Sequence, residues 1–335
     1  MRNILICGGA GYIGSHCARI MREAGYNCVI FDNLSEGHRQ AVKDFTLVAG
    51  DLSDTALLTE TIRKYDINGV MHFAAFALVG VSVKEPIRYY QNNIGGTASL
   101  LDAMRQTGVT RIVFSSTCAT YGEDVPVPIT EEVPQRPCSP YGESKLVVEQ
   151  LLKRCDDAYG IKSAALRYFN AAGAMPDGSI GEDHMPETHL IPLTLREALF
   201  NKGDLRVHGT DYPTRDGSCV RDYIHVLDLA SAHLKALQYL ENGGETDAFN
   251  LGTGVGSSVL EVIEAARAVT GIDIKYDIAG RRAGDPPTLV ASAEKAKRVL
   301  GWTPECSDLA TIIKDAWSWH KSSPNGYEDR QDKKQ

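Results

Sequence analysis

Short apolar runs alternate with amphipathic segments through the first half of the chain. Apolar positions recur with helical spacing in residues 12–25, 55–65, 86–107 and 140–159. Between these segments lie runs rich in β-branched residues, each of which ends in glycine or polar residues. Such alternation predicts an α/β fold with a doubly wound parallel sheet of the Rossmann type. The predicted strands are residues 3–7, 27–31, 45–49, 69–73, 111–115 and 163–167.

The regular alternation stops after Arg167. Residues 171–189 are rich in glycine, proline and acidic residues, and we expect them to form a long loop. Mixed elements follow, which predict a smaller α/β domain that covers the first. Its predicted helices are residues 191–201, 226–240, 257–270 and 309–320, and its predicted strands are residues 205–208 and 248–251. The polar segment 321–335 is expected to be a disordered tail.

A glycine-rich turn links the first strand to the first helix. Gly8, Gly11 and Gly14 are spaced G-x-x-G-x-x-G. Glycine lets the backbone turn tightly and approach a pyrophosphate, while the helix N-terminus supplies amide donors and a positive dipole end. A simple tight turn would use the same residue type, but the strand before and the helix after favour a dinucleotide site.

Acidic residues end the second and third strands. Asp32 can bind both ribose hydroxyls of adenosine and would repel a 2′-phosphate, so we expect NAD rather than NADP despite nearby Arg39. Asp51 and Leu52 are placed to contact adenine. A turn or N-cap role is the alternative for Asp32, and an N-cap role is the alternative for Asp51.

Tyr141 and Lys145 form a Y-x-x-x-K pair that shares one helix face. A tyrosine has a pKa of about 10, so acting as a base at pH 7 requires about 4 kcal/mol of stabilisation. A unit charge about 5 Å away at an effective dielectric near 20 supplies about 3 kcal/mol. Lys145 and an oxidised nicotinamide together would therefore suffice. An ordinary surface pair is the alternative, but the preceding strand end at Ser115, Ser116 and Thr117 makes the pair specific.

Composition narrows the class of protein. The chain has 335 residues, of which 43% are hydrophobic, enough for a sizeable core. Its net charge of −8 argues against a nucleic-acid partner bound through a basic surface. None of the eight cysteines forms a C-x-x-C pair, so we expect no metal site and a reducing compartment. We expect no signal peptide and no membrane span, hence a cytoplasmic location.

From about residue 1 to 320, the sequence resembles the extended short-chain dehydrogenase/reductase family, and within it the epimerases that act on UDP-sugars at C4. The resemblance rests on seven segments: the glycine turn 8–14, His72–Ala75, Tyr141–Lys145, Leu166–Asn170, Asp211–Thr214, Val220–Val226 and Arg281–Asp285. The later segments are far more specific than the glycine turn.

The resemblance implies a reaction. Thr117 would hydrogen-bond the sugar 4-hydroxyl, and Tyr141 would remove its proton while C4 delivers hydride to NAD. Lys145 would hold the nicotinamide ribose. The 4-keto sugar would then rotate and accept the hydride on its other face. The implied function is reversible interconversion of UDP-glucose and UDP-galactose, with slower action on UDP-N-acetylhexosamines.

The resemblance also assigns binding residues. Further residues would contact NAD: Tyr12, Ile13, Asn33, Phe73, Ala74, Ala75, Asn93, Ser115 and Phe169. Arg221 and Arg282 would hold the diphosphate, for which guanidinium groups suit. The remaining substrate contacts would be Asn170, His189, Leu190, His208, Tyr223, Asp285 for the uridine ribose, and Leu289 for the hexose pocket.

Several of these residues have a simpler alternative. His189 and His208 could be satisfied loop residues, Asn93 a helix-surface residue and Leu289 a core residue. Ala77 stands where some epimerases carry a lysine that reaches the cofactor phosphates, which weakens the case for very tight NAD retention.

Rival functions make different demands on the site. A 4,6-dehydratase needs an acid and a base after the active-site threonine, whereas here Cys118 and Ala119 follow Thr117. Ala119 also disfavours a UDP-glucuronate decarboxylase. Epimerases of UDP-glucuronate or UDP-pentoses remain open. A non-catalytic NAD sensor is disfavoured because such proteins tend to lose the Tyr-Lys pair.

The expected organisation follows from the resemblance. Residues 1–169 would form the NAD-binding domain, to which some later segments can return, and residues 170–320 mainly the substrate-binding domain. A homodimer joined by the helices at 86–107 and 140–159 is expected.

Overall fold

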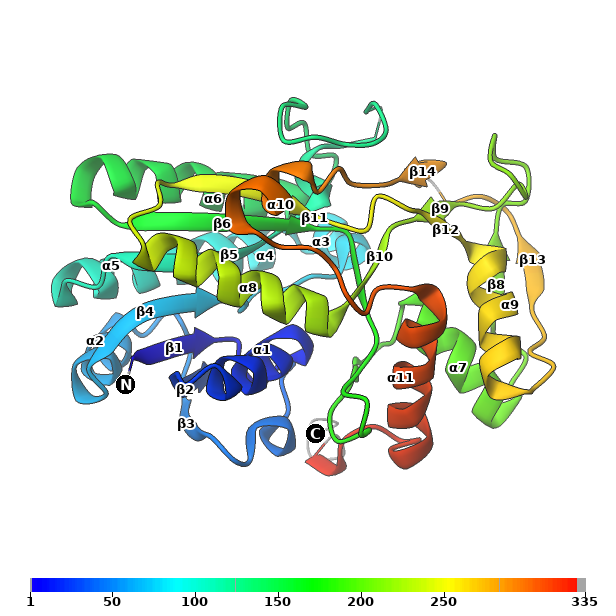
Figure 1. The fold of residues 1–335 in the computed structure, drawn as a ribbon, viewed down its shortest axis with the longest axis horizontal. Coiled ribbons are helices and arrows are strands. Elements are labelled where there is room, and N and C mark those ends of the chain that lie inside the picture. Colours follow the sequence, from blue (N-terminus) through cyan, green and yellow to red (C-terminus); the bar gives the residue numbers. More distant parts are fainter. Residues whose placement is uncertain (1, 124, 283, 330–335) are drawn as a thin grey trace.

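The computed structural model describes residues 2–123, 125–282 and 284–329. Its centre is a seven-stranded sheet of order β11-β6-β5-β4-β1-β2-β3, in which all pairings are parallel. The strands point toward a smaller domain at one end of the molecule (Figure 1). The predicted Rossmann-type sheet is confirmed. The strand bounds are β1 Asn3–Cys7, β2 Asn27–Asp32, β3 Thr46–Ala49, β4 Ile67–His72, β5 Arg111–Thr117, β6 Lys162–Tyr168 and β11 Asp247–Leu251.

Helices cover both faces of this sheet, which explains why its strands are continuous apolar runs. In β1, Ile4 and Ile6 pack in one buried cluster, whereas Leu5 and Cys7 pack in another. The first cluster includes residues of α1 (Tyr12–Glu23) and α8 (Val226–Glu241). The second includes residues of α2 (Thr55–Lys64), α5 (Gly96–Thr107) and α6 (Pro140–Tyr159).

The helix predicted at 86–107 is interrupted by a wider turn. It consists of α4 (Pro86–Tyr89), a π-helical segment η2 (Tyr90–Gly95) and α5. The preceding short helix α3 (Val79–Lys84) was not predicted. π-helical turns often occur at functional sites, and this one carries the buried Asn93.

Later segments return to the nucleotide domain, so the smaller domain is not one continuous stretch. β11 pairs with β6 at the sheet edge, and α8 packs against α1. Phe249 and Leu251 of β11 are fully buried in the cluster shared with α1 and α8. Helix α10 (Glu294–Leu300) also contacts β11 and α8.

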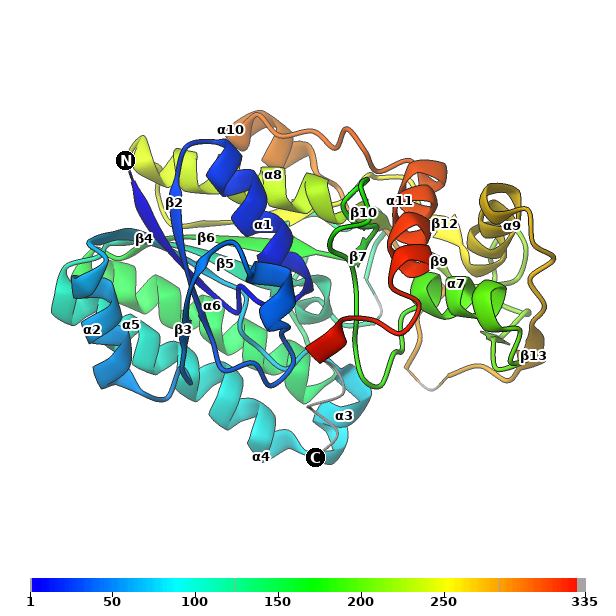
Figure 2. The ribbon, with the colours of Figure 1, turned by 90° about the horizontal axis from the view of Figure 1, so that it is seen from below.

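The smaller domain is built on three helices that share one buried cluster (Figure 2). They are α7 (Leu190–Phe200), α9 (Val259–Thr270) and α11 (Leu309–Ser322). Short strand pairs complete it or join it to the sheet: β7 (Asn170–Ala172) with β10 (Tyr223–His225), β8 (Arg206–His208) with β13 (Asp277–Ala279), and β9 (Val220–Arg221) with β12 (Ser257–Ser258) and β14 (Thr288–Leu289).

The expectation of a disordered tail is wrong for residues 321–329. Helix α11 continues to Ser322, and Tyr327 beyond it is only 5% exposed. The Tyr327 ring stacks on His38 with centroids 4.6 Å apart, and His38 Nδ1 lies 2.8 Å from Asp329 Oδ1. The buried Tyr327 ring and the His38–Asp329 contact therefore anchor this polar segment. Residues 330–335 lie outside the described residues.

Among the residues that the structure describes, no helix is long and apolar enough to cross a membrane. All eight cysteines are free thiols.

Candidate active site

The glycine turn combines two different requirements. Gly8 has a φ of +74°, and a Cβ there would lie 2.4 Å from the Ala74 nitrogen. A Cβ on Gly14 would lie 2.3 Å from the Gly8 oxygen. Both glycines are therefore required by backbone packing. Gly11 is the N-cap of α1, and the nearest atom to its Cβ position is 3.4 Å away. The open helix N-terminus is free to take a pyrophosphate.

Asp32 lies at the carboxyl end of β2 in a groove shared with Gly8 and Gly11. Its carboxylate accepts hydrogen bonds from the Ala10 amide at 2.9 Å and the Leu34 amide at 2.8 Å. Because it is only 8% exposed, its position is fixed by the surrounding backbone.

The same groove collects the other predicted adenosine contacts. Asp51 accepts a hydrogen bond from Asn33 Nδ2 at 2.8 Å and from the Ser53 amide at 2.9 Å. The N-cap of α2 is Asp54, which excludes that alternative for Asp51. Further groove residues are Leu52, Phe73, Ala74 and Ala75, as expected, and also Ser35, Glu36, Gly37, Phe76 and Asn92, which the sequence analysis missed.

Asn93 holds the loop after β4 against α6. Its Oδ1 accepts from the Phe76 amide at 2.9 Å, and its Nδ2 donates to the Phe76 carbonyl at 3.1 Å and to Ser144 Oγ at 3.0 Å. The side chain is 2% exposed, so the helix-surface alternative is wrong. Its effect on the cofactor would be exerted by positioning this loop.

The predicted catalytic residues meet where β5 ends and α6 begins. Thr117 is the last residue of β5, and its hydroxyl lies close enough to the Tyr141 phenol to lower the pKa of that phenol. Lys145, one turn further along α6, donates from Nζ to the Ser115 carbonyl at 2.8 Å. Its Nζ lies 6.0 Å from the centroid of the Tyr141 ring. The shared helix face predicted from Y-x-x-x-K therefore points at the strand end.

Burial dominates the protonation of this pair. It raises the pKa of Tyr141 to about 12, although the nearby Thr117 hydroxyl lowers it. Burial also lowers the pKa of Lys145 to about 7, against the attraction of Glu149. Arg167 Nη2 lies 2.6 Å from Glu149 Oε2 and occupies much of that charge. Because burial raises the pKa of the phenol, Tyr141 needs the positive charge of an oxidised nicotinamide as well as that of Lys145, which is the combination expected from the sequence.

The two residues directly after Thr117 are neither acids nor bases at neutral pH. Cys118 and Ala119 begin a short 3-10 turn, η3 (Cys118–Thr120). Burial raises the pKa of the Cys118 thiol to about 12, so it stays protonated at neutral pH. Neither residue can exchange the protons that a 4,6-dehydratase must move.

On the substrate side, two residues predicted to bind the substrate form an ion pair with each other. The Arg221 guanidinium on β9 forms an ion pair with Asp285 and also donates to the Val220 carbonyl at 2.8 Å. Arg282 is exposed. The diphosphate contact expected of Arg221 and the ribose contact expected of Asp285 thus draw on groups that already neutralise one another.

Three other predicted substrate residues, Leu289, Asn170 and His208, lie in the short strands β14, β7 and β8. Leu289 is partly buried against the cluster that contains Cys118 and Phe169, a placement that suits both a hexose-pocket and a core role. Asn170 Nδ2 donates to the Asp222 carbonyl at 3.2 Å, and His208 Nδ1 lies 3.3 Å from the Gly280 oxygen.

The remaining three lie in the core of the smaller domain or at its edge. Tyr223 is buried in β10. His189 and Leu190 lie at the start of α7, and His189 Nδ1 contacts Glu182 Oε1.

Asp222 organises this region and was not singled out from the sequence. It is completely buried. Its carboxylate accepts from the Thr253 amide at 2.9 Å, the Gly254 amide at 3.2 Å and the Ala291 amide at 3.1 Å. It therefore joins the loop after β11 to the segment after β14. The sequence feature that could have indicated this role is its position between Arg221 and Tyr223 in the V-R-D-Y segment.

Comparisons with known proteins agree with this geometry. Residues 5–315 match the family model described as GDP-mannose 4,6 dehydratase. UDP-glucose 4-epimerase of Lacticaseibacillus casei is 52% identical over 98% of this chain and 99% of its own length. That of Streptococcus mutans is also 52% identical, over 98% and 99%.

Solved structures give the same result. The UDP-glucose 4-epimerase from Brucella ovis in complex with NAD has a TM-score of 0.93 and 49% identity, covering 95% of this chain and 98% of that one. The Bifidobacterium longum enzyme in complex with NAD+ and UDP has a TM-score of 0.90 and 36% identity, covering 97% and 100%. The chain belongs to the family that the matching model describes, and within it to the UDP-glucose 4-epimerases.

Proposed function

We propose that this protein is an NAD-dependent epimerase that interconverts UDP-glucose and UDP-galactose by inverting C4. The observation that carries the proposal is the meeting of Thr117, Tyr141 and Lys145 beside a turn without a second acid or base. Such a site can remove and return one proton at one carbon. Cys118 and Ala119, which follow Thr117, supply no acid or base for the elimination that a dehydratase performs.

The residues of the nucleotide domain fit NAD. The α1 N-terminus behind Gly11 suits a pyrophosphate, and the fixed carboxylate of Asp32 suits the two ribose hydroxyls of adenosine. Asp32 would repel the 2′-phosphate of NADP. Bound NAD would supply a reversible hydride acceptor and a positive charge. Because the hydride taken from C4 returns to the sugar, the reaction involves no net oxidation.

The proton at the sugar 4-hydroxyl is the task of the protein. Tyr141 takes it as a phenolate, and Thr117 orients the hydroxyl through its own hydrogen bond. With its pKa at about 12, the phenol needs a cationic neighbour to ionise near pH 7. The Lys145 ammonium supplies part of the required positive charge. Lys145 would also hold the nicotinamide ribose, so the positive charge of bound NAD would supply the rest.

On the substrate side, the predicted ligands would act together. Arg221 and Arg282 hold the diphosphate, and Asp285 takes the uridine ribose. We include UDP-N-acetylhexosamines as slower substrates because Leu289 leaves more room than a tyrosine would.

A coupled assay tests the function directly. The protein is incubated with UDP-galactose, and UDP-glucose formation is followed through UDP-glucose dehydrogenase. UDP-N-acetylglucosamine, UDP-glucuronate and UDP-xylose are compared as alternative substrates, each with its own product analysis. We expect turnover of both UDP-hexoses to exceed that of the others. Preferential turnover of UDP-glucuronate or UDP-xylose would overturn the substrate assignment.

We further propose a homodimer that involves α3, α4 and α6. The supporting observation is the exposed apolar pair Val83 and Ile87, with 62% and 65% exposure, next to α6. Light scattering of the full chain and of Ile87→Glu measures it, and equal masses for both would contradict the interface. A cytoplasmic location is proposed from the eight free thiols.

A further inference from the structure

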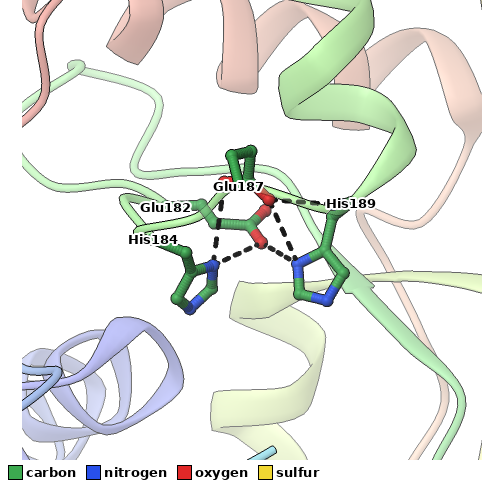
Figure 3. Close-up of side chains that lie close together, drawn as sticks. All are labelled: Glu182, His184, Glu187 and His189. Carbon is green, nitrogen blue, oxygen red and sulfur yellow. Dashed lines mark hydrogen bonds and ion pairs between the residues drawn. The ribbon is translucent and has the colours of Figure 1, made fainter. Parts of the chain in front are cut away.

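Four potential metal ligands converge in the segment that leads into α7. Glu182, His184, Glu187 and His189 all extend side chains toward one point (Figure 3). Their spacing is E-x-H-x-x-E-x-H. The sequence analysis expected no metal because it searched for cysteine pairs, which this set does not contain.

Three of the distances between ligand atoms are close to those of a coordination shell, and the shorter His189–Glu182 contact would have to lengthen around a metal. His184 Nδ1 lies 3.2 Å from Glu182 Oε1 and 3.7 Å from Glu187 Oε2. His189 Nδ1 lies 3.7 Å from Glu187 Oε1 and contacts Glu182 Oε1. All four ligand atoms are within 4.8 Å of one another. Tetrahedral zinc with bonds of about 2.0–2.1 Å has ligand-to-ligand edges of about 3.3–3.4 Å.

Burial creates a demand for positive charge at this point. The Glu182 and Glu187 side chains are each 4% exposed, whereas those of His184 and His189 are 29% and 54% exposed. Two buried carboxylates side by side are costly without a compensating cation. A dication between them would supply that charge and use both imidazole nitrogens.

The donor set selects the metal. Mg²⁺ and Ca²⁺ take oxygen ligands, so two imidazoles argue against both. Imidazole with carboxylate suits zinc, and four protein ligands in tetrahedral spacing form a closed, structural type of site. We propose that Glu182, His184, Glu187 and His189 bind one structural Zn²⁺.

The position of the cluster indicates what the metal would stabilise. His184 packs edge-on against Tyr12 at the start of α1, with ring centroids 6.3 Å apart. The Tyr12 hydroxyl donates to the Gly173 carbonyl at 2.7 Å. His189 is the N-cap of α7. Zinc would therefore pin the segment that passes from the cofactor domain to the substrate domain, and set the direction in which α7 begins.

The competing explanation is a metal-free network of two protonated imidazoles and two carboxylates. Both arrangements leave the cluster neutral. They differ in protons, because zinc requires neutral imidazoles and would displace about two protons from the cluster when it binds.

Metal content of the full-length protein is the first test. Chelator-treated protein is titrated with ZnSO4, and bound metal is measured by inductively coupled plasma mass spectrometry together with Tm. We expect one zinc per chain, a rise of Tm with zinc, and release of about two protons per zinc near neutral pH. A wild-type protein that binds no zinc and shows no Tm change would overturn the proposal in favour of the protonated network.

Matched variants locate the site. Glu187→Gln keeps the side-chain shape and its acceptor oxygen for the Thr188 and His189 amides, but it removes the charge. His184→Gln is the second single variant. Each of the two should weaken zinc binding by more than about 100-fold, which is the upper range for changes to outer-shell residues. Glu60→Gln on the exposed face of α2 is the control and should bind zinc as the parent does.

Zinc retained equally by all three variants would place the metal elsewhere and overturn this assignment. Should the cluster variants fail to fold, the visible spectrum of Co²⁺-substituted wild-type protein still decides. A four-coordinate spectrum supports the site, and a six-coordinate spectrum contradicts it. Because these readouts do not involve sugar turnover, their failure is distinct from failure of the proposed function.

Discussion

The cofactor side and the substrate side of this site are built in different ways. On the cofactor side, Gly8, Gly14 and Asp32 are held by backbone packing and amide hydrogen bonds. On the substrate side, Arg221 and Asp285 hold each other. The first arrangement offers its groups to a ligand without rearrangement. The second must exchange an internal ion pair for the diphosphate and ribose of the substrate, so part of the binding energy is offset.

The catalytic residues lie between these regions and share features of both. Their positions are fixed, since Lys145 Nζ donates to the Ser115 carbonyl and Thr117 Oγ1 accepts a hydrogen bond from the Ala119 amide. Their protonation is not, because burial pushes the pKa of Tyr141 up and that of Lys145 down. The geometry is thus complete in the protein alone, whereas the charge state depends on what binds beside it.

The largest effect is expected at the junction itself. Tyr141→Phe should lower kcat by at least about 100-fold, the usual scale for removal of an acid–base group. NAD content and UDP-sugar affinity should persist because the ring still packs. Tyr239→Phe is the control, because the Tyr239 hydroxyl donates to the Glu245 carbonyl, away from Tyr141. Near-normal turnover in Tyr141→Phe would exclude it as the base.

On the cofactor side, Asp32→Asn should weaken NAD binding by about tenfold to a hundredfold, since hydrogen bonds to a charged group contribute about 1.5–3 kcal/mol. Discrimination against NADP should fall as well. The measurement is the nucleotide released from denatured protein, with exposed Asp44→Asn as control. NADP released from the parent protein would show that Arg39 or another cation overrides Asp32.

On the substrate side, Arg221→Ala and Arg282→Ala should each raise the UDP dissociation constant about tenfold or more, on the same scale of charged hydrogen bonds. The loss should be smaller for Arg221, because its charge is already shared with Asp285. Calorimetric titration with UDP compares the two. Equal losses would mean that exchanging the ion pair costs nothing. No loss in either variant would mean that Arg221 and Arg282 do not hold the diphosphate.

The smallest effect concerns sugar choice. Leu289→Tyr should lower kcat/KM for UDP-N-acetylglucosamine relative to UDP-glucose, within the roughly 1–3 kcal/mol that hydrophobic packing discriminates. The parent enzyme should turn over both sugar classes. A ratio unchanged by tyrosine would assign Leu289 to the core cluster around Tyr121 and Phe169 rather than to the hexose pocket.

Local pattern alone determined the Rossmann-type sheet, the glycine turn and the shared face of Tyr141 and Lys145. Strand alternation, helix period and turn chemistry depend on residues a few positions apart, so a sequence displays them directly. The same holds for Asp32, whose place at a strand end follows from the strand itself.

Tertiary structure decided what depends on distant partners. It placed β11 beside β6, turned Asn93 inward on a π-helical segment, and anchored the tail through Tyr327 on His38. It also set the pKa of Tyr141 and paired Arg221 with Asp285. Burial and ion pairing arise from groups brought together by the whole fold, and the free energy of each depends on surroundings that no short stretch of sequence contains.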